Sequence, residues 1–243
     1  MPEYFSQFGE DKILEKIFPE KGCAVEVGAY DGRTGSNTLY FERRDWNCVL
    51  VEPNPELART IRSFRVGRLF DCAVGARPGV VMLQIPIGAE TLASVTAEPA
   101  HIERMARSSS QLETIEVRLR TLDDVLEEAD VTKVDFITID VEGYELDALR
   151  GFDLARWNPR IVILEDNSFG TDVAVPLYME ARGYIRFRSS GCNDWYCRAT
   201  DDLLTRPSVL ITESIKSLQA VKRITKAWID RGWRRAWNSR RNF

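Results

Sequence analysis

The sequence predicts a single α/β domain built on a doubly wound, mostly parallel sheet. Short runs of β-branched residues alternate with segments of helical periodicity, which is the pattern of a parallel sheet covered by helices on both faces. The chain has 243 residues, of which 44% are hydrophobic and 29% charged, so it can bury one sizeable core. It contains no internal repeat. We expect seven principal strands that end in an antiparallel hairpin.

The first half of the chain predicts three strand and helix units. In chain order we expect a helix at 10–18, a strand at 24–29, a helix from Ser36, a strand at 49–52 closed by Pro53-Asn54-Pro55, a helix at 56–64 and a strand at 69–74. The alternation then changes, because two added strands at 80–85 and 115–119 flank a polar stretch, 88–111. This stretch is long for a structureless loop, so we interpret it as an inserted cap that is functional or partly helical.

The second half resumes the regular winding. We expect helices at 122–129, 145–150 and 173–182 between strands at 134–140 and 161–165, and then two strands at 184–188 and 195–199 that are close enough to pair antiparallel. These elements complete a domain over residues 1–211. A last helix is expected at 212–231, within a basic, Trp-rich segment over residues 212–243.

Charge and composition exclude several classes of protein. The formal net charge is -4, so the body of the protein is not expected to attract nucleic acid. The N-terminus lacks the apolar core of a signal peptide, and no apolar run reaches the roughly 20 residues that a transmembrane helix needs. A cytoplasmic location is therefore expected. Five cysteines are interpreted as structural thiols, since the spacing of Cys192 and Cys197 is poor for zinc.

The C-terminal segment differs in charge from the rest of the chain. From Glu213 onwards, nine Lys or Arg residues accompany only two acids. Leu218, Val221, Ile224 and Trp228 form one apolar stripe at helical spacing. Two interpretations stay open: a terminal helix packed on the domain, or peripheral contact with a membrane that carries a lipid-linked acceptor.

The loop after the first strand indicates the ligand. It contains Gly28 and Gly32, which let the backbone turn sharply beside a helix that begins near Ser36. A dinucleotide loop has a third glycine and holds a pyrophosphate, which Asp31 would repel. An acidic turn suits S-adenosylmethionine, whose ammonium and sulfonium are cationic and whose carboxylate favours a helix N-terminus.

Two further strand ends fit the same ligand. Glu52 ends the second strand, 24 residues after Gly28, where a carboxylate can accept both ribose hydroxyl protons. Asp71, with Cys72 and Ala73, follows the next strand and could meet the adenine edge. The carboxyl ends of these strands converge at the switch point of an open sheet.

Eight segments of the sequence form a further set of motifs: Ser6 to Asp11, Val25 to Gly32, Ser36-Asn37, Val51-Glu52-Pro53, Ala73-Val74-Gly75, Leu122-Asp123-Asp124, Ile139 to Glu145 and Ile163-Leu164-Glu165. In these segments the sequence resembles the FkbM-type methyltransferases. The resemblance implies a class I methyltransferase fold, S-adenosylmethionine as donor, and O-methylation of sugars, glycolipids or secondary metabolites. The sequence departs from the family at Glu26, where many relatives have Asp. The family has no pattern that can be transferred to residues 88–111 or to the C-terminal segment. Together with the loop, the resemblance predicts a donor site that comprises Gln7, Asp11, Glu26, Gly28, Ala29, Tyr30, Asp31, Gly32, Ser36, Asn37, Glu52, Pro53, Asp71, Cys72, Ala73 and Asp140.

Acids at the later strand ends are candidates for catalysis. Methyl transfer to a hydroxyl needs correct positioning and a base that removes the proton. Asp140, Glu142 and Glu165 are candidates, because an acid that ends an apolar strand is costly unless it is used. Glu142 could equally cap the following helix. His101, the only histidine, lies in the cap segment and has a suitable pKa for a base, although a lone histidine there is often a surface residue.

A metal ion could replace the base. Asp140, Asp166 and Asn167 offer oxygen ligands from adjacent strand ends, which suits Mg²⁺.

Two other functions share this pattern. An NAD-dependent oxidoreductase would use the same winding, but Asp31 and the missing third glycine disfavour it. A non-catalytic module that binds a nucleoside and is tethered by the tail would retain the donor pocket. We expect an enzyme that acts on a small-molecule, sugar or lipid-linked acceptor.

Overall fold

A computed structural model of the chain describes residues 3–95, 99–168 and 170–205. The chain divides into a compact unit over residues 1–199 and a second unit over residues 200–243. The described part of the second unit contains one short 3-10 helix, η2 (Asp202–Thr205). The predicted helix at 212–231 lies outside the described residues. No helix among the described residues is both long and apolar enough to cross a bilayer.

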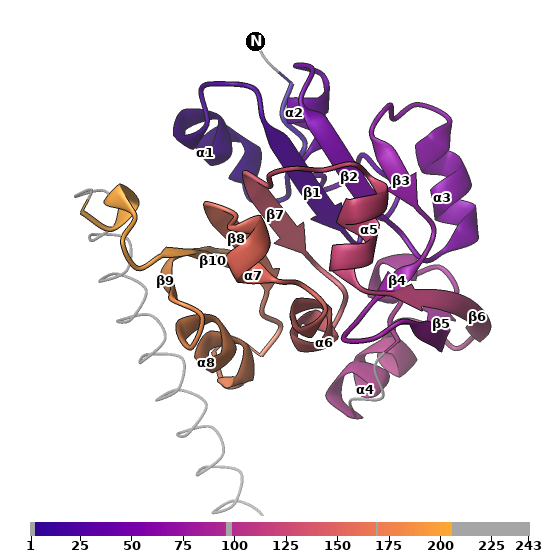
Figure 1. The fold of residues 1–243 in the computed structure, drawn as a ribbon. Helices are drawn as coiled ribbons and strands as arrows, with labels where there is room; N and C mark the ends of the chain where they lie inside the picture. The colour runs from indigo at the N-terminus through magenta and orange to yellow at the C-terminus, as the bar shows by residue number, and fades with distance from the viewer. Residues whose placement is uncertain (1–2, 96–98, 169, 206–243) are drawn as a thin grey trace, which may run out of the picture. The chain divides into compact units, whose positions relative to one another are not determined.

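The first unit confirms the predicted α/β fold (Figure 1). Its principal sheet has seven strands, which in spatial order are β3 (Arg68–Phe70), β2 (Asn47–Val51), β1 (Cys23–Val27), β7 (Phe136–Ile139), β8 (Ile161–Glu165), β10 (Asn193–Arg198) and β9 (Tyr184–Ser190). The first five strands in this order, β3, β2, β1, β7 and β8, are parallel to one another. The hairpin of β9 and β10 is antiparallel, as the sequence predicts. The winding reverses between β1 and β7, which leaves a crevice at their carboxyl ends.

Helices cover both faces of this sheet. One face packs against α5 (Leu122–Glu128), α6 (Glu145–Arg150), α7 (Leu154–Trp157) and α8 (Ala174–Glu180) through an aliphatic core, and α5 and α7 lie in front of the sheet in Figure 1. The other face packs against α1 (Glu10–Ile17), α2 (Leu39–Glu42) and α3 (Pro55–Arg62), with Phe41 against Phe136 at its centre. Side chains alternate between these faces, so Val25 and Val27 enter the aliphatic core while Glu26 points towards the second set of helices.

The third predicted strand is wrong in one respect, because the chain changes sheets within it. Residues 68–70 form β3, whereas Ala73–Val74 form β4 in a separate sheet of order β4-β6-β5, with β5 at Gly79–Pro86 and β6 at Leu112–Arg120. Asp71 lies at the break and pairs with Arg62 of α3. The second sheet has its own small core around Leu83 and Val117.

The stretch at 88–111 is partly helical, as one of its two interpretations predicts. It contains η1 (Glu90–Leu92) and α4 (Pro99–Ser108). Ser94 forms an isolated bridge with Gln84 of β5, which fixes the η1 segment to the second sheet. Residues of η1 and of α4 lie beside the carboxyl ends of the principal strands, where they form one wall of a cavity.

Candidate functional site

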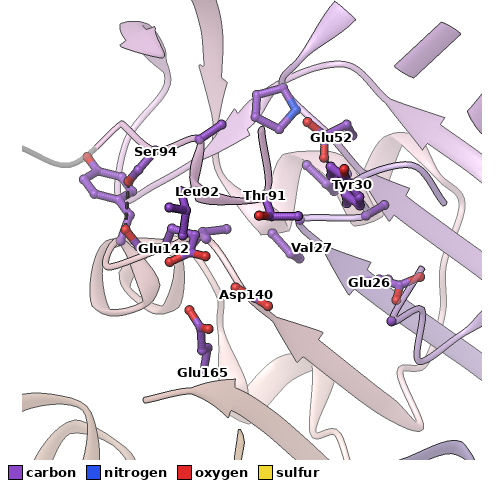
Figure 2. Close-up of a pocket in the computed structure, with 18 of the residues that line it drawn as sticks. Glu26, Val27, Tyr30, Glu52, Thr91, Leu92, Ser94, Asp140, Glu142 and Glu165 are labelled. Carbon is purple, nitrogen blue, oxygen red and sulfur yellow. Dashed lines mark hydrogen bonds between the residues drawn. The ribbon is translucent and has the colours of Figure 1, made fainter. Parts of the chain in front are cut away.

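A cavity of about 570 Å³ lies at the switch point between β1 and β7. Its walls come from the carboxyl ends of β1, β2, β7 and β8, from the η1 segment and from Gln7 near the N-terminus. Figure 2 shows Asp140 near the middle of the cavity, Glu52 beside Tyr30, and Glu142 beside Leu92 and Ser94. The predicted donor and catalytic residues that line it are Gln7, Glu26, Gly28, Ala29, Tyr30, Ser36, Asn37, Glu52, Pro53, Cys72, Ala73, Asp140, Glu142 and Glu165.

The backbone is strained at two positions of the cavity wall. Tyr30 and Glu142 have φ values of 52° and 53°, in the left-handed region that side chains other than Asn, Asp and Gly rarely adopt. Such strain persists where the surrounding structure requires it, and it gathers at functional sites. Gly28 explains the close approach of β1 and β7, because a Cβ at this residue would lie 1.8 Å from the carbonyl oxygen of Asp140.

Glu52 is a buried carboxylate that the protein satisfies only in part. One oxygen accepts the backbone N–H of Tyr30 at 2.8 Å and the other accepts that of Asn54 at 2.9 Å. A carboxylate has about four acceptor positions, so each oxygen keeps one for a ligand in the cavity. Burial raises the pKa of Glu52 to about 7, and the two N–H donors oppose that shift. The strained turn at Tyr30 therefore orients an acceptor suited to a pair of hydroxyl groups.

Glu26 holds the loop at 32–38 in place by accepting hydrogen bonds from it. Its two oxygens accept the Ser36 hydroxyl at 2.8 Å, the Thr38 hydroxyl at 2.5 Å and the Asn37 backbone N–H at 2.7 Å. With these partners it shapes the wall of the cavity. Asn37 lines the cavity as well, and its side-chain oxygen is buried without a hydrogen-bond partner. An unsatisfied buried acceptor calls for an external donor, and an ammonium group would supply one.

Asp140 and Glu165 form a coupled pair at the ends of β7 and β8. Figure 2 shows the two side chains pointing toward one another. Burial, followed by the charge of Asp140, raises the pKa of Glu165 to about 9, and burial also raises the pKa of Asp140. At neutral pH Glu165 therefore stays protonated and donates a hydrogen bond to Asp140. Asp140 opens onto the cavity, whose walls withdraw it from bulk water. Its charge is one cause of the raised pKa of Glu165, so Asp140 is the ionised member of the pair.

Glu145 lies close to this pair, but its carboxylate already has hydrogen-bond partners in the protein. Its carboxylate accepts the backbone N–H groups of Val141 and Gly143, in the turn that starts α6. Burial raises the pKa of Glu145 to about 7. Carboxylate oxygens of Asp140, Glu145 and Glu165 lie within 4.8 Å of one another.

Glu142 connects the cap to the floor of the cavity and does not cap α6. Its carboxylate pairs with Arg104 of α4 and accepts the side-chain N–H of Asn167 at 3.1 Å, while its carbonyl oxygen accepts the Ser94 hydroxyl at 2.8 Å. Arg104 is the one Lys or Arg among the described residues that line the cavity. His101 supports this arrangement: Nε2 lies 3.0 Å from the carbonyl oxygen of Leu92, and Nδ1 contacts Arg104.

The structure places several predicted residues away from the cavity, each for a local reason. Asp31 accepts hydrogen bonds from Arg33 and Thr34 in its own turn and does not line the cavity. Asp71 is paired with Arg62 and does not line the cavity either, so its predicted contact with an adenine edge is not formed by this arrangement. The others outside the cavity lining are Asp11, Gly32, His101 and Asp166.

The reasons for these four differ. Asp11 accepts the backbone N–H groups of Phe5 and Ser6 and fixes the N-terminal arm that carries Gln7. The carbonyl of Gly32 accepts Arg65. Both ring nitrogens of His101 are engaged, so it is not placed as a base.

Asp166 folds back on its own turn and accepts from Ser168 and Gly170, while Asn167 donates to Glu165 and Glu142. The Mg²⁺ triad is therefore not assembled, and we assign no step to a metal ion.

Sequence reasoning missed part of the lining. The η1 segment over residues 90–95 was predicted as a cap, but none of its residues was singled out, and Arg104 was missed although it lies one helical turn after His101. Two cysteines line the cavity, namely the buried Cys72, which was predicted, and the half-buried Cys192 at the hairpin, which was not. Tyr144 and Leu57 carry no signal that separates them from core residues.

Comparison with known proteins agrees with this geometry. Residues 26–186 match the Methyltransferase FkbM domain, a range that holds both Glu52 and the pair of Asp140 and Glu165. A relative named Methyltransferase 1, from Beauveria bassiana (strain ARSEF 2860), is 25% identical over an alignment of 187 residues; the match covers 69% of this chain and 74% of that protein. The family match spans more than half of the chain and confirms the resemblance seen in the motifs. The chain therefore belongs to the FkbM family of methyltransferases, whose reaction is methyl transfer.

Proposed function

We propose that the protein transfers a methyl group from S-adenosylmethionine to a hydroxyl group of a sugar, glycolipid or secondary metabolite. The observation that carries the donor is Glu52: a buried carboxylate at a strand end, with one free acceptor position on each oxygen. Two vicinal ribose hydroxyls supply the matching donors. The unsatisfied side-chain oxygen of Asn37 suits the donor's ammonium group in the same cavity.

When bound, the donor supplies a methyl group on a positively charged sulfur. The residues of the chain hold the acceptor and take its proton. Asp140 is suited to that task because it opens onto the cavity and its pKa is raised above that of an ordinary aspartate, which makes it a stronger base. Glu165 keeps its own proton and holds Asp140 by a hydrogen bond. Much of the remaining rate comes from positioning.

The η1 segment and Arg104 form the side of the cavity assigned to the acceptor. Leu92 and Leu83 give this wall an apolar part, and Glu142 with Arg104 gives it a polar part. A polyhydroxylated molecule with one apolar face suits such a surface. A lipid-linked acceptor, approached through the basic C-terminal segment, is the variant of this proposal that the tail's composition supports.

A binding measurement followed by a product assay tests the proposal. Titration calorimetry of the full chain with S-adenosylhomocysteine should give heat with one site, and titration with NADH should give none. Release of S-adenosylhomocysteine is then assayed with a panel of neutral sugars, glycolipids and hydroxylated natural products. Donor binding without product across the panel would favour the non-catalytic module, and absence of binding would refute the donor.

A further inference from the structure

Arg65 is a fully buried cation beneath the loop at 32–38. Its side chain is 0% exposed. The guanidinium donates to the carbonyl oxygen of Gly32 at 2.7 Å, to the Thr38 hydroxyl at 2.9 Å and to the Glu42 carboxylate at 3.0 Å. It also reaches the Ser36 hydroxyl at 3.3 Å and lies 3.7 Å from a Glu26 oxygen. A planar fork with five N–H donors is needed to serve so many partners at once.

These contacts join the two ends of the loop. Gly32 stands at its start and Thr38 at its end, so one guanidinium fixes the separation of the loop's ends from below. Glu26 of β1 fixes the middle, through the Ser36 hydroxyl and the Asn37 backbone N–H. Arg65 lies behind the loop and outside the cavity lining. Glu26 lines the cavity but already accepts three hydrogen bonds from the loop, so neither charge needs to contact a ligand.

The opposite side of the loop faces the cavity. Thr34, Gly35, Ser36 and Asn37 line it, and the Asn37 side-chain oxygen is buried and unpartnered there. Glu52 comes from a different strand, and the backbone N–H groups of Tyr30 and Asn54 hold it, whereas Arg65 holds the loop at 32–38. The cavity thus has one polar group that depends on the Arg65 network and another that does not.

We propose that Arg65 is a positioning residue which sets Asn37 for the amino-acid end of the donor. This inference rests on the proposed function. The Asn37 side-chain oxygen accepts a hydrogen bond from the donor's ammonium group, whereas Glu52 accepts hydrogen bonds from the ribose hydroxyls. Loss of the guanidinium fork therefore weakens binding of a ligand that has the amino-acid end and spares a ligand that has only the nucleoside.

The test compares two ligands and two matched substitutions by titration calorimetry on the full chain. S-Adenosylhomocysteine carries the amino-acid end, and 5′-methylthioadenosine keeps the adenosine and sulfur but lacks it. Arg65→Lys retains the charge and removes the fork. Arg62→Lys makes the same change three residues earlier, at an exposed ion pair with Asp71 outside the cavity.

Arg65→Lys is expected to raise the Kd for S-adenosylhomocysteine about tenfold and to leave that for 5′-methylthioadenosine within about twofold. Arg62→Lys should change neither. Asn37→Ala should reproduce the selective loss, and adding Arg65→Lys to it should produce no further loss, because the two act through one hydrogen bond. Asn37→Ala also keeps the test open if Arg65→Lys does not fold.

Equal losses for both ligands in Arg65→Lys, or additive losses in the double variant, would overturn the positioning role while leaving the proposed function intact. A selective loss that fails to appear in Asn37→Ala would overturn it as well. A wild-type chain that binds neither ligand would refute the donor itself, and this inference with it.

Discussion

Replacing Glu52 by glutamine changes the ribose contact while keeping the shape of the side chain. Glu52 offers one acceptor position on each oxygen, and Gln keeps only one oxygen. A hydrogen bond to a charged acceptor is worth about 1.5–3 kcal/mol, so loss of one should cost about 2 kcal/mol of binding. At 1.4 kcal/mol per factor of ten, the Kd for S-adenosylhomocysteine should rise about thirtyfold.

The same substitution should change how stability depends on pH. The pKa of Glu52 is raised to about 7 from 4.5 in the folded protein, so the folded state binds more protons than the unfolded state between these values. The contribution of Glu52 to stability therefore falls as the pH rises from 4.5 through 7 and is constant above that range. At 1.36 kcal/mol per pKa unit the fall attributable to Glu52 is about 3 kcal/mol. Glu52→Gln removes this part of the fall.

Two measurements check this reasoning. Titration calorimetry at pH 8 compares the Kd of the wild-type chain and Glu52→Gln, and urea unfolding at pH 5 and pH 8 compares their stabilities. Glu145 and Glu165 also have raised pKa values and contribute to the fall in both proteins, so the difference between the two slopes isolates Glu52. A Kd that stays within about threefold, or equal pH slopes, would refute the role assigned to Glu52.

Three further predictions concern other parts of the chain. Gly28→Ala should destabilise the fold by about 3 kcal/mol more than Gly88→Ala in urea unfolding. Both glycines have φ near 80°, but only a Cβ at Gly28 would meet a backbone atom, so equal losses of stability would contradict the close approach of β1 and β7. Asp140→Asn should lower kcat by about 10² to 10⁴ in single-turnover assays, with Glu165→Gln lowering it less, and the reverse order would exclude Asp140 as the base. A chain ending at Asp230 should sediment less with anionic vesicles than the full chain, and equal sedimentation would remove the membrane proposal.

The sequence could predict the main sheet and much of the cavity, because both follow from rules that act along a strand. Parallel strands end at one edge of a sheet, so acids at the ends of separate strands must come together. This logic located Glu52, Asp140 and Glu165, and the family resemblance added Glu26; all four line the cavity. Most of the predicted element bounds lie within two residues of the observed ones, since apolar runs and capping residues mark them.

The same logic could not tell which acids are already in use. Asp31 and Asp166 follow strands like the others, but each carboxylate accepts hydrogen bonds within its own turn. Short polar side chains compete for nearby backbone N–H groups, and sequence spacing does not reveal the winner. Arg65 and Arg104 were missed for the opposite reason, since their partners lie far along the chain and no local pattern announces them.

The acids that do line the cavity differ in how many donors the protein already gives them, and this difference assigns their roles. Glu26 accepts three hydrogen bonds and lies beside Arg65, so it has little capacity for a ligand and instead shapes the loop. Glu52 accepts one on each oxygen and keeps room for two hydroxyl protons. Asp140 and Glu165 share a proton at neutral pH, which leaves one carboxylate able to take another. In the function we propose, carboxylates thus supply the wall, the donor contact and the proton transfer of one methyltransferase cavity, because each carboxylate is satisfied to a different degree.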